Sequence, residues 1–273
     1  MAITTRDQLA AAMASATNAP FSKASITAVA GFYYSLFRSA AGMPAASAVT
    51  APTTTGNTLD RTSSGALNIP SGGSNTLYIT AAQIAGAVVG TLLIADRLVE
   101  YGGLSGITTG AQSVSAVTLP TRGNSGVGCE LWLDVLTAVG ATASATVTAS
   151  YTNSGGTSGR TATLVGGIPA SGGVVNRAYR FALQAGDVGV QSVQSFSSGT
   201  STGTAGSLGL TIRKPLLMLP ITLANVAAFL GYAETGLAQV PSDATSGACL
   251  ELLVLATTTS TGALQGQLSV AQG

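Results

Sequence analysis

The chain has 273 residues, which is enough for one large β domain or two small ones. Only 8% of its residues are charged, against about 25% in ordinary soluble domains, and its net charge is +1. A chain this close to neutral has no basic field with which to hold nucleic acid or an anionic membrane surface. The sequence has no histidine, which removes the commonest general base, the usual catalytic triads and most zinc sites.

The low charge also indicates whether the protein functions as a free monomer or in an assembly. A free monomer usually keeps surface charge for solubility. A surface poor in charge suits a protein that neighbours cover in an assembly, and it also suits an abundant extracellular structural protein. The composition therefore favours an assembly role.

Residues 1–45 are predicted to form an N-terminal arm. Thr5 is expected to cap a short helix, with Gln8 as its capping-box partner, in place of a secretory signal. An aromatic cluster follows this helix. Such a cluster either docks on its own domain or inserts into a neighbouring subunit, because aromatic residues are enriched at interface cores. The candidate assembly contacts are Phe32, Tyr33, Tyr34 and Phe37.

The remainder of the chain is predicted to be a linker and a β domain. Residues 46–76 are rich in Ser, Thr, Gly and Pro, which is typical of a linker. Residues 77–273 carry short β-like segments with turn signals about every ten residues, so we predict a mainly β fold, a jelly-roll-like β-sandwich. The expected strands include residues 91–99, 129–137, 145–151, 160–165, 175–184, 188–197 and 207–214.

The segment CELWLDVLT (129–137) gives the clearest strand pattern. Its alternation predicts one buried face and one polar face. The two faces are Cys129, Leu131, Leu133 and Val135 on the buried side, and Glu130, Trp132 and Asp134 on the other. Residues 145–151 and 160–165 flank a glycine-rich turn, which predicts a hairpin.

A weak internal repeat runs through the β region. Residues 120–137 align without gaps on residues 241–258, and apolar positions fall on apolar positions. Upstream, ITAAQIA (79–85) resembles ITLANVA (221–227). The repeat predicts either duplicated halves of one sandwich or two related lobes, over residues 77–215 and 216–273.

An uncharged run over residues 77–95 holds the Gly86-x-x-x-Gly90 spacing found between packed membrane helices. A membrane span needs about 20 mostly apolar residues, and Thr80 and Gln83 interrupt this run. The same two residues have the spacing of a second capping box. We therefore predict a short helix that ends at Gly90, then a strand, and no membrane span.

Two carboxylate pairs are the candidates for acid–base chemistry, Asp96 with Glu100 and Glu130 with Asp134. Paired carboxylates do such work in glycosidases. Nothing else in the sequence indicates a carbohydrate cleft, so solvated or intersubunit charges are the favoured interpretation. Two cysteines, Cys129 and Cys249, are too few for a disulfide scaffold and are expected to be buried free thiols.

Other candidate sites are weaker. The glycine-rich stretches 154–159 and 171–175 lack the Lys and the following helix of a phosphate loop. Asp187 lacks the acidic neighbours of a calcium loop. Basic and aromatic residues alternate over residues 177–181, but so little basic charge surrounds them that a strand is favoured over a nucleic-acid surface. We predict no catalytic residue, cofactor, metal site or small-molecule substrate, and hence no enzyme.

Four stretches carry a family resemblance. They are TTRDQLAAAMASATNAPFSKAS, ATASATVTASYTNSGGTSGRTATL, LQAGDVGVQSVQSFSSGTSTGTAG and CLELLVLATTTSTGALQGQLSV. They resemble a group of tailed-bacteriophage virion proteins, and the resemblance spans most of the chain. It implies a structural protein of the head or head–tail region without catalysis, and no binding residues carry over from it.

The functional hypothesis is a virion structural protein that assembles in the host cytoplasm. A capsid decoration or cement protein, which bridges and stabilises capsid subunits, is favoured over a tail or head–tail connector component. The expected partners are the major capsid protein or other virion proteins and further copies of the chain, with no nucleic acid and no membrane. A secreted or surface-displayed module that binds glycans or receptors is the alternative from a different class.

Overall fold

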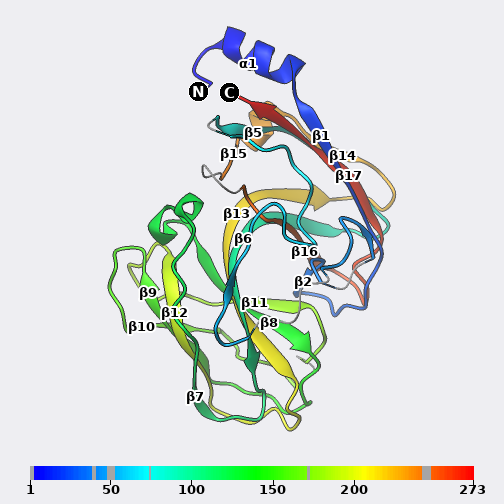
Figure 1. Ribbon diagram of the computed structural model, residues 1–273. Coiled ribbons are helices and arrows are strands. Elements are labelled where there is room, and N and C mark those ends of the chain that lie inside the picture. Colours follow the sequence, from blue (N-terminus) through cyan, green and yellow to red (C-terminus); the bar gives the residue numbers. More distant parts are fainter. Residues whose placement is uncertain (1–2, 39–40, 48–52, 74, 171–172, 242–246) are drawn as a thin grey trace. The chain divides into compact units, whose positions relative to one another are not determined.

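The computed structural model describes residues 3–38, 41–47, 53–73, 75–170, 173–241 and 247–273 (Figure 1). The fold is mainly β, as predicted, and it divides into two compact units. Unit 1 comprises Met1–Ala48, Asp60–Asp96 and Leu216–Gly273, and unit 2 comprises Val49–Leu59 and Arg97–Pro215. Two long strands, β6 (Gly90–Leu104) and β13 (Ser207–Ile221), each have one part in either unit.

Unit 1 contains two layers of sheet. The first is a six-stranded antiparallel sheet in the order β14-β5-β17-β1-β3, in which β15 also pairs with β5. Its strands are β1 (Thr17–Lys23), β3 (Gly42–Met43), β5 (Leu77–Gly86), β14 (Ala228–Leu230), β15 (Gln239–Val240) and β17 (Leu264–Gln272). In the second layer β16 (Leu250–Ala256) pairs with β2 (Tyr33–Ser35) and with the first part of β6. The helices are α1 (Arg6–Ala14) and α2 (Tyr232–Thr235).

The core of unit 1 lies between these layers. Phe21, Ile79 and Leu268 from the first sheet belong to the same buried cluster as Ile94 and Leu252 from the second. Burial of side chains of this size contributes roughly 1.5–3 kcal/mol each relative to exposure. The two sheets therefore hold together through one continuous hydrophobic core.

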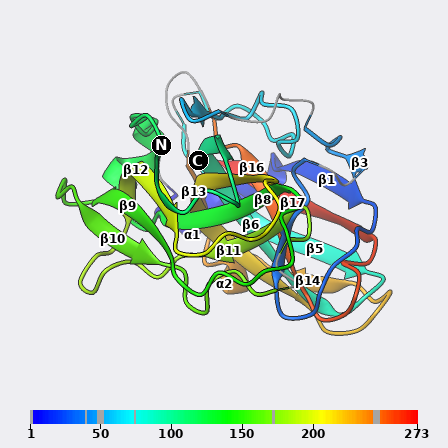
Figure 2. The same ribbon diagram turned by 90° about the horizontal axis from the view of Figure 1, so that it is seen from below.

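Unit 2 is also built from antiparallel strands. One sheet has the order β10-β9-β12-β7, and Figure 2 shows β9, β10 and β12 side by side. Its strands are β7 (Gly110–Ser113), β9 (Val147–Asn153), β10 (Arg160–Thr163) and β12 (Val190–Ser198). Strand β8 (Glu130–Thr137) pairs with β11 (Arg177–Arg180) and with β13, and β4 (Asn57–Thr58) pairs with β6. A short 3-10 helix spans Thr121–Gly126.

Several local predictions are confirmed. The Thr5 side chain accepts the backbone N–H of Gln8, and the Gln8 side chain accepts the backbone N–H of Thr5, so α1 begins with the expected capping box. Strands β9 and β10 form the expected hairpin, with Arg160 opposite Tyr151. Both cysteines are buried free thiols.

No helix in the described ranges is long and apolar enough to cross a membrane.

The predicted helix over the first part of residues 80–90 is wrong. Residues 77–86 form strand β5, which pairs with β17 on one side and with β14 and β15 on the other. The Thr80 hydroxyl donates to the Ser269 carbonyl instead of capping a helix. Partners that follow more than 140 residues later in the chain outweigh the local capping signal.

The prediction that β8 has only one buried face is also wrong. Trp132 and Asp134, on the predicted polar face, are buried along with the apolar face, and Glu130 is half-buried. Side chains from β6, β11 and β13 pair with the polar groups on this second face.

The predicted arm and linker lie inside the fold. Strand β1 lies between β17 and β3, and β2 pairs with β16. Within residues 46–76, Leu67 and Ile69 are part of the core of unit 1. The unit boundaries therefore differ from those expected at residues 45, 76 and 215, because strand pairing joins segments from both ends of the chain.

Only one half of the internal repeat has a structural counterpart. Strands β8 and β16 occupy aligned positions, one in each unit. Residues 79–85 lie in a strand, whereas residues 222–227 lie outside the strands. Part of the second copy, residues 242–246, lies outside the described residues.

A buried lysine in β1 gives unit 1 a pH dependence. Lys23 donates from Nζ to the Pro44 carbonyl at 2.7 Å, and burial lowers its pKa from 10.5 to about 8. Between these two values the unfolded chain holds a proton that the folded chain has released, so the stability should rise with pH across this window. Urea unfolding at several pH values should show this rise in the wild type and a smaller rise in Lys23→Met. Equal slopes in the two proteins would contradict the assignment.

Candidate functional site

The most concentrated chemistry in the described residues is a buried cluster of charges in unit 2. Asp134 Oδ2 on β8 lies 3.0 Å from Arg97 Nη2 on β6 and 2.8 Å from Arg213 Nη2 on β13. The Thr211 hydroxyl donates to the same oxygen at 2.7 Å, and Arg97 also pairs with Glu100 at 2.9 Å. Thus, one carboxylate joins three strands.

The strand register explains why these groups meet. Trp132 lies opposite Thr211 and Asp134 lies opposite Gly209, so the polar residues of β8 lie beside those of β13 on the same face of their sheet. Gly209 allows the Tyr101 backbone to approach β13 closely, because a Cβ at position 209 would lie only 2.5 Å from the Tyr101 carbonyl oxygen. The Arg213 guanidinium lies over the Trp132 ring, 5.4 Å from its centroid, which adds a cation–π contact.

The charges of this cluster support one another. Burial by itself would raise the pKa of Asp134, but Arg213 and Arg97 overcome this effect and hold the pKa below its ordinary value of 3.8. Asp134 therefore stays ionised beside two buried guanidinium groups. Such an arrangement fixes strand register and offers no group for acid–base chemistry.

The two carboxylate pairs from the sequence are held by structural contacts. Asp96 accepts the Cys249 backbone N–H at 2.9 Å, and Glu100 pairs with Arg97. The interpretation of these carboxylates as solvated or intersubunit charges is wrong for Asp96, Glu100 and Asp134, which are all buried. Arg97 is a sequence neighbour of Glu100, but only the fold brings Arg97 and Arg213 to Asp134 and the Cys249 N–H to Asp96.

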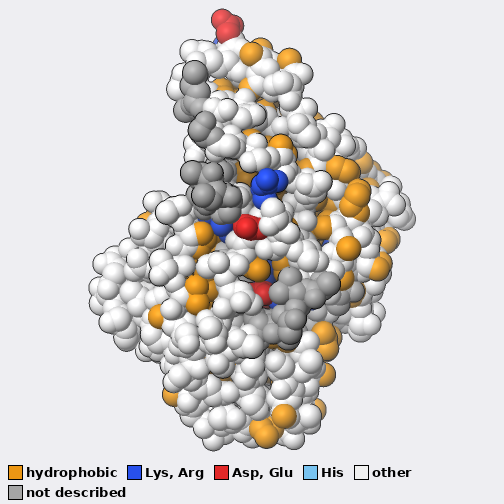
Figure 3. All heavy atoms as spheres, in the orientation of Figure 1, with side chains coloured by type: hydrophobic (Ala, Val, Ile, Leu, Met, Phe, Trp, Pro, Cys, Tyr) orange, Lys and Arg blue, Asp and Glu red, His pale blue; other side chains and the backbone are white. Residues whose placement is uncertain are grey.

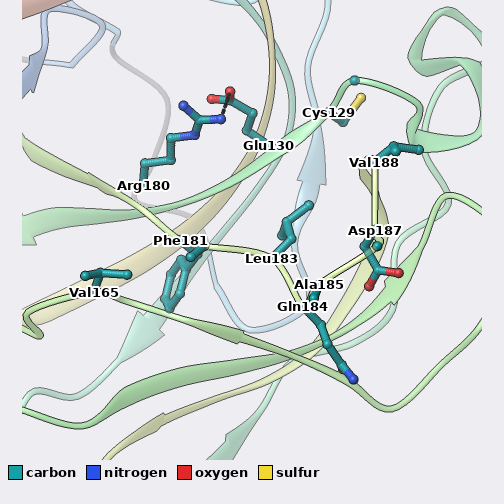
Figure 4. Close-up of a pocket in the computed structure, with 13 residues that line it drawn as sticks. Cys129, Glu130, Val165, Arg180, Phe181, Leu183, Gln184, Ala185, Asp187 and Val188 are labelled. Atoms are coloured by element: carbon teal, nitrogen blue, oxygen red, sulfur yellow. Dashed lines mark ion pairs between the residues drawn. The ribbon is translucent and has the colours of Figure 1, made fainter.

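A groove with a volume of about 590 Å³ lies beside the start of β8 in unit 2. Residues 128–130, 180–188 and Val165 line it, and Figure 4 shows Glu130 and Arg180 pointing toward each other across an ion pair of 2.7 Å. Burial raises the pKa of Glu130, while Arg180 and the Trp132 N–H favour its charged form. Cys129, at the groove wall, is buried and its thiol lies 3.6 Å from the Gly123 carbonyl. The charged side chains that line the groove, Glu130, Arg180 and Asp187, are all held in ion pairs. The groove lining is therefore close to neutral and suits passive contact better than catalysis.

A second ionic group holds the turn formed by residues 183–188, which lines one side of this groove. Asp187 accepts hydrogen bonds from Arg160 Nε at 2.9 Å, from Asn153 Nδ2 at 2.7 Å and from the Tyr151 hydroxyl. The bonds from Arg160 and Tyr151 lower the pKa of Asp187 to about 2. All of the partners are side chains of the β9–β10 hairpin, so Asp187 ties the turn to that hairpin.

Replacing Asp187 should loosen this turn without unfolding unit 2. In Asp187→Asn the charge partner of Arg160 is lost, so we expect faster hydrogen exchange over residues 183–188. Exchange measured by mass spectrometry should stay unchanged in β8. Asp7→Asn, at an exposed position in α1, is the matched control. Unchanged exchange in the turn would show that Asp187 does not hold it.

The basic and aromatic residues at 177–181 do not form an exposed stacking surface. Arg177 is buried and donates to the Tyr179 hydroxyl at 3.2 Å, and Tyr179 and Phe181 are buried too. Arg180 pairs with Glu130. In the part of the chain that the structure describes, no group of three or more Cys, Asp or Glu residues is placed to hold a metal ion.

The four aromatic assembly candidates lie on and around β2 in unit 1. Tyr34 and Phe37 are buried, and Phe32 and Tyr33 are half-buried. The Tyr34 hydroxyl accepts the Val29 backbone N–H at 2.8 Å. Their role as assembly contacts stays a prediction, and any contact through this cluster would involve Phe32 and Tyr33 first.

The surface is poorer in charge than the sequence indicates. The chain has 11 basic and 10 acidic residues, and nine of those that the structure describes are buried. Figure 3 shows few basic or acidic atoms on the visible face. Thirteen large hydrophobic side chains in the described ranges are exposed, Phe229, Leu223, Val165 and Val188 most strongly. Sequence reasoning missed both features, because charge counts do not reveal where the charges lie.

Comparison with known proteins gives no family. No protein-family profile matches the chain, and no curated protein matches it. Among solved structures, the VP2 subviral particle of infectious bursal disease virus aligns with 94% of this chain and 81% of its own, at 8% identity and a TM-score of 0.22. T=1 particles derived from infectious bursal virus align with 94% of this chain and 78% of their own, at 11% identity and a TM-score of 0.19. TM-scores this low establish no shared fold, so this likeness carries no part of the argument.

Proposed function

We propose that this chain is a non-catalytic structural protein of a virus particle, where neighbouring subunits cover its surface. The observation that carries the proposal is the placement of charge: nine charged side chains of the described residues are buried, while large hydrophobic side chains stay exposed. A free monomer gains solubility from the opposite arrangement. The carboxylates Asp96, Glu100, Glu130, Asp134, Asp187 and Glu251 all have structural partners.

Within this proposal, capsid decoration of a tailed bacteriophage is the favoured role, and the jelly-roll-like sandwich expected from the sequence remains part of it. The partners would be the major capsid protein and further copies of the chain. A decoration protein binds through many modest contacts whose effects multiply across a lattice. An almost neutral surface with exposed apolar side chains supports contact of this kind.

Quantitative mass spectrometry of purified particles tests the proposal. The copy number of this chain is measured against that of the major capsid protein in the same sample. A ratio near one, or a simple fraction of one, would support decoration. A count in the low tens would place the protein in the tail or connector and overturn the decoration role. Absence from particles would overturn the virion function itself.

A further inference from the structure

The six-stranded sheet of unit 1 ends in the short strand β14. It pairs with β5 on one side, with Phe229 opposite Gln83. Ala228 and Leu230 pack against the core of unit 1, whereas Phe229 points away from it and is 66% exposed. No described strand pairs with the other side of β14, so this edge can accept the main chain of another strand.

The residues that flank β14 make this edge apolar. Leu223, Val226 and Tyr232 are 61%, 52% and 49% exposed. The sequence has no charged residue between Lys214 and Glu234. Figure 3 shows hydrophobic side chains along the right-hand margin, where Figure 1 places β14 and β17. Several exposed apolar residues gathered along one short segment indicate an interaction site.

The opposite edge of the same sheet is closed. Strand β3 has two residues, and Pro44, which has no N–H to donate, follows it directly. Short edge strands, prolines and lysines are the usual means by which proteins prevent edge pairing. Strand β14 is also short, but residues 223–232 contain neither proline nor lysine. The β3 edge therefore has two of these protections, and the β14 edge has only one.

We propose that the β14 edge pairs with the β14 edge of a second copy of this chain, antiparallel and about a two-fold axis. An open edge needs an extended partner, and an uncharged apolar row needs an uncharged apolar partner. In a second copy Ala228–Leu230 are extended and residues 223–232 carry no charge, so this segment satisfies both needs and no like charges meet. The two Phe229 side chains then lie on the same face, where cross-strand aromatic pairs stabilise a sheet. The pairing does not depend on the proposed function.

One strand pair buries less than the roughly 1,600 Å² of a standard interface, so the dimer should be weak and should dissociate on dilution. Sedimentation equilibrium of the purified full chain should show self-association that Phe229→Glu weakens at least about tenfold, equivalent to about 1.4 kcal/mol. Val165→Glu, at a 78% exposed valine of unit 2, is the matched control and should associate like the wild type. A wild type that stays monomeric at every concentration, or a Phe229→Glu variant that associates equally well, would overturn the proposal.

Cross-linking locates the contact without relying on affinity. Phe229→Cys should give dimers with a short bismaleimide, because both native cysteines are buried, whereas Val165→Cys should not. Cross-linking of Phe229→Cys in particles only to a different protein would assign the edge to that partner and overturn self-pairing. Dimers formed through β14 by a chain that is absent from particles would uphold this pairing and refute only the virion function.

Discussion

Asp134→Asn is expected to lower the free energy of unfolding by about 3–5 kcal/mol, the usual cost of removing one partner from a buried ion pair. The variant keeps the shape of the side chain but leaves Arg97 and Arg213 buried without the charge that both of them contact. Trp132 is the only tryptophan in the chain and lies beside Arg213, so its fluorescence reports directly on unit 2. Urea titration followed by this fluorescence measures the loss.

The same cluster predicts a pH dependence. The pKa of Asp134 in the folded chain is below 3.8, so its contribution is complete above that value and is lost as the pH falls toward the folded pKa. The difference between wild type and Asp134→Asn should therefore shrink in acid. Asp7→Asn, at an exposed position, should stay within about 0.5 kcal/mol of the wild type. An equally small effect for Asp134→Asn would show that the cluster does not hold unit 2 together.

Deletion of residues 1–45 is expected to unfold unit 1. The deletion removes β1 and β3, the last two strands of the first sheet, and β2 of the second layer, together with the buried side chains of Phe21, Tyr34 and Phe37. Truncation of one large aromatic core side chain alone usually costs about 3–5 kcal/mol. Circular dichroism and thermal unfolding should show the loss of a cooperative transition.

Deletion of residues 1–15 is the matched control for this experiment. It removes α1, in which only Ala12 is buried, and it leaves β1 intact. This shorter variant should fold and unfold cooperatively. If the chain without residues 1–45 also folds cooperatively, the N-terminal region is a detachable arm, and the aromatic residues Phe32, Tyr33, Tyr34 and Phe37 are free to serve assembly.

What the sequence predicts well is what neighbouring residues decide. The capping box at Thr5 needs only Gln8, and the hairpin of β9 and β10 needs only the turn between the strands. The helix expected at Thr80 fails for the converse reason: β5 gains its partners from residues 228–272, and no local signal carries them.

The charge cluster around Asp134 is harder to predict from the sequence than the fold is. Arg97, Asp134 and Arg213 are tens of residues apart, and the two arginines reach the Asp134 carboxylate because β13 pairs with both β8 and β6. The open edge at Phe229 depends on which strand ends the sheet, which the sequence does not reveal. The alternation in residues 129–137 gave a usable signal, because it placed Glu130, Trp132 and Asp134 on one face before any partner was known.

The central claim is that neighbouring subunits cover this charge-poor surface. Methionine oxidation tests it directly, because Met13, Met43 and Met218 are 40%, 49% and 52% exposed in the isolated chain. Dilute peroxide converts exposed methionine to the sulfoxide, and peptide mass spectrometry gives a rate for each site. The account predicts that at least one of the three sites is oxidised several-fold more slowly in purified particles than in the isolated chain. Equal rates at all three sites would contradict it.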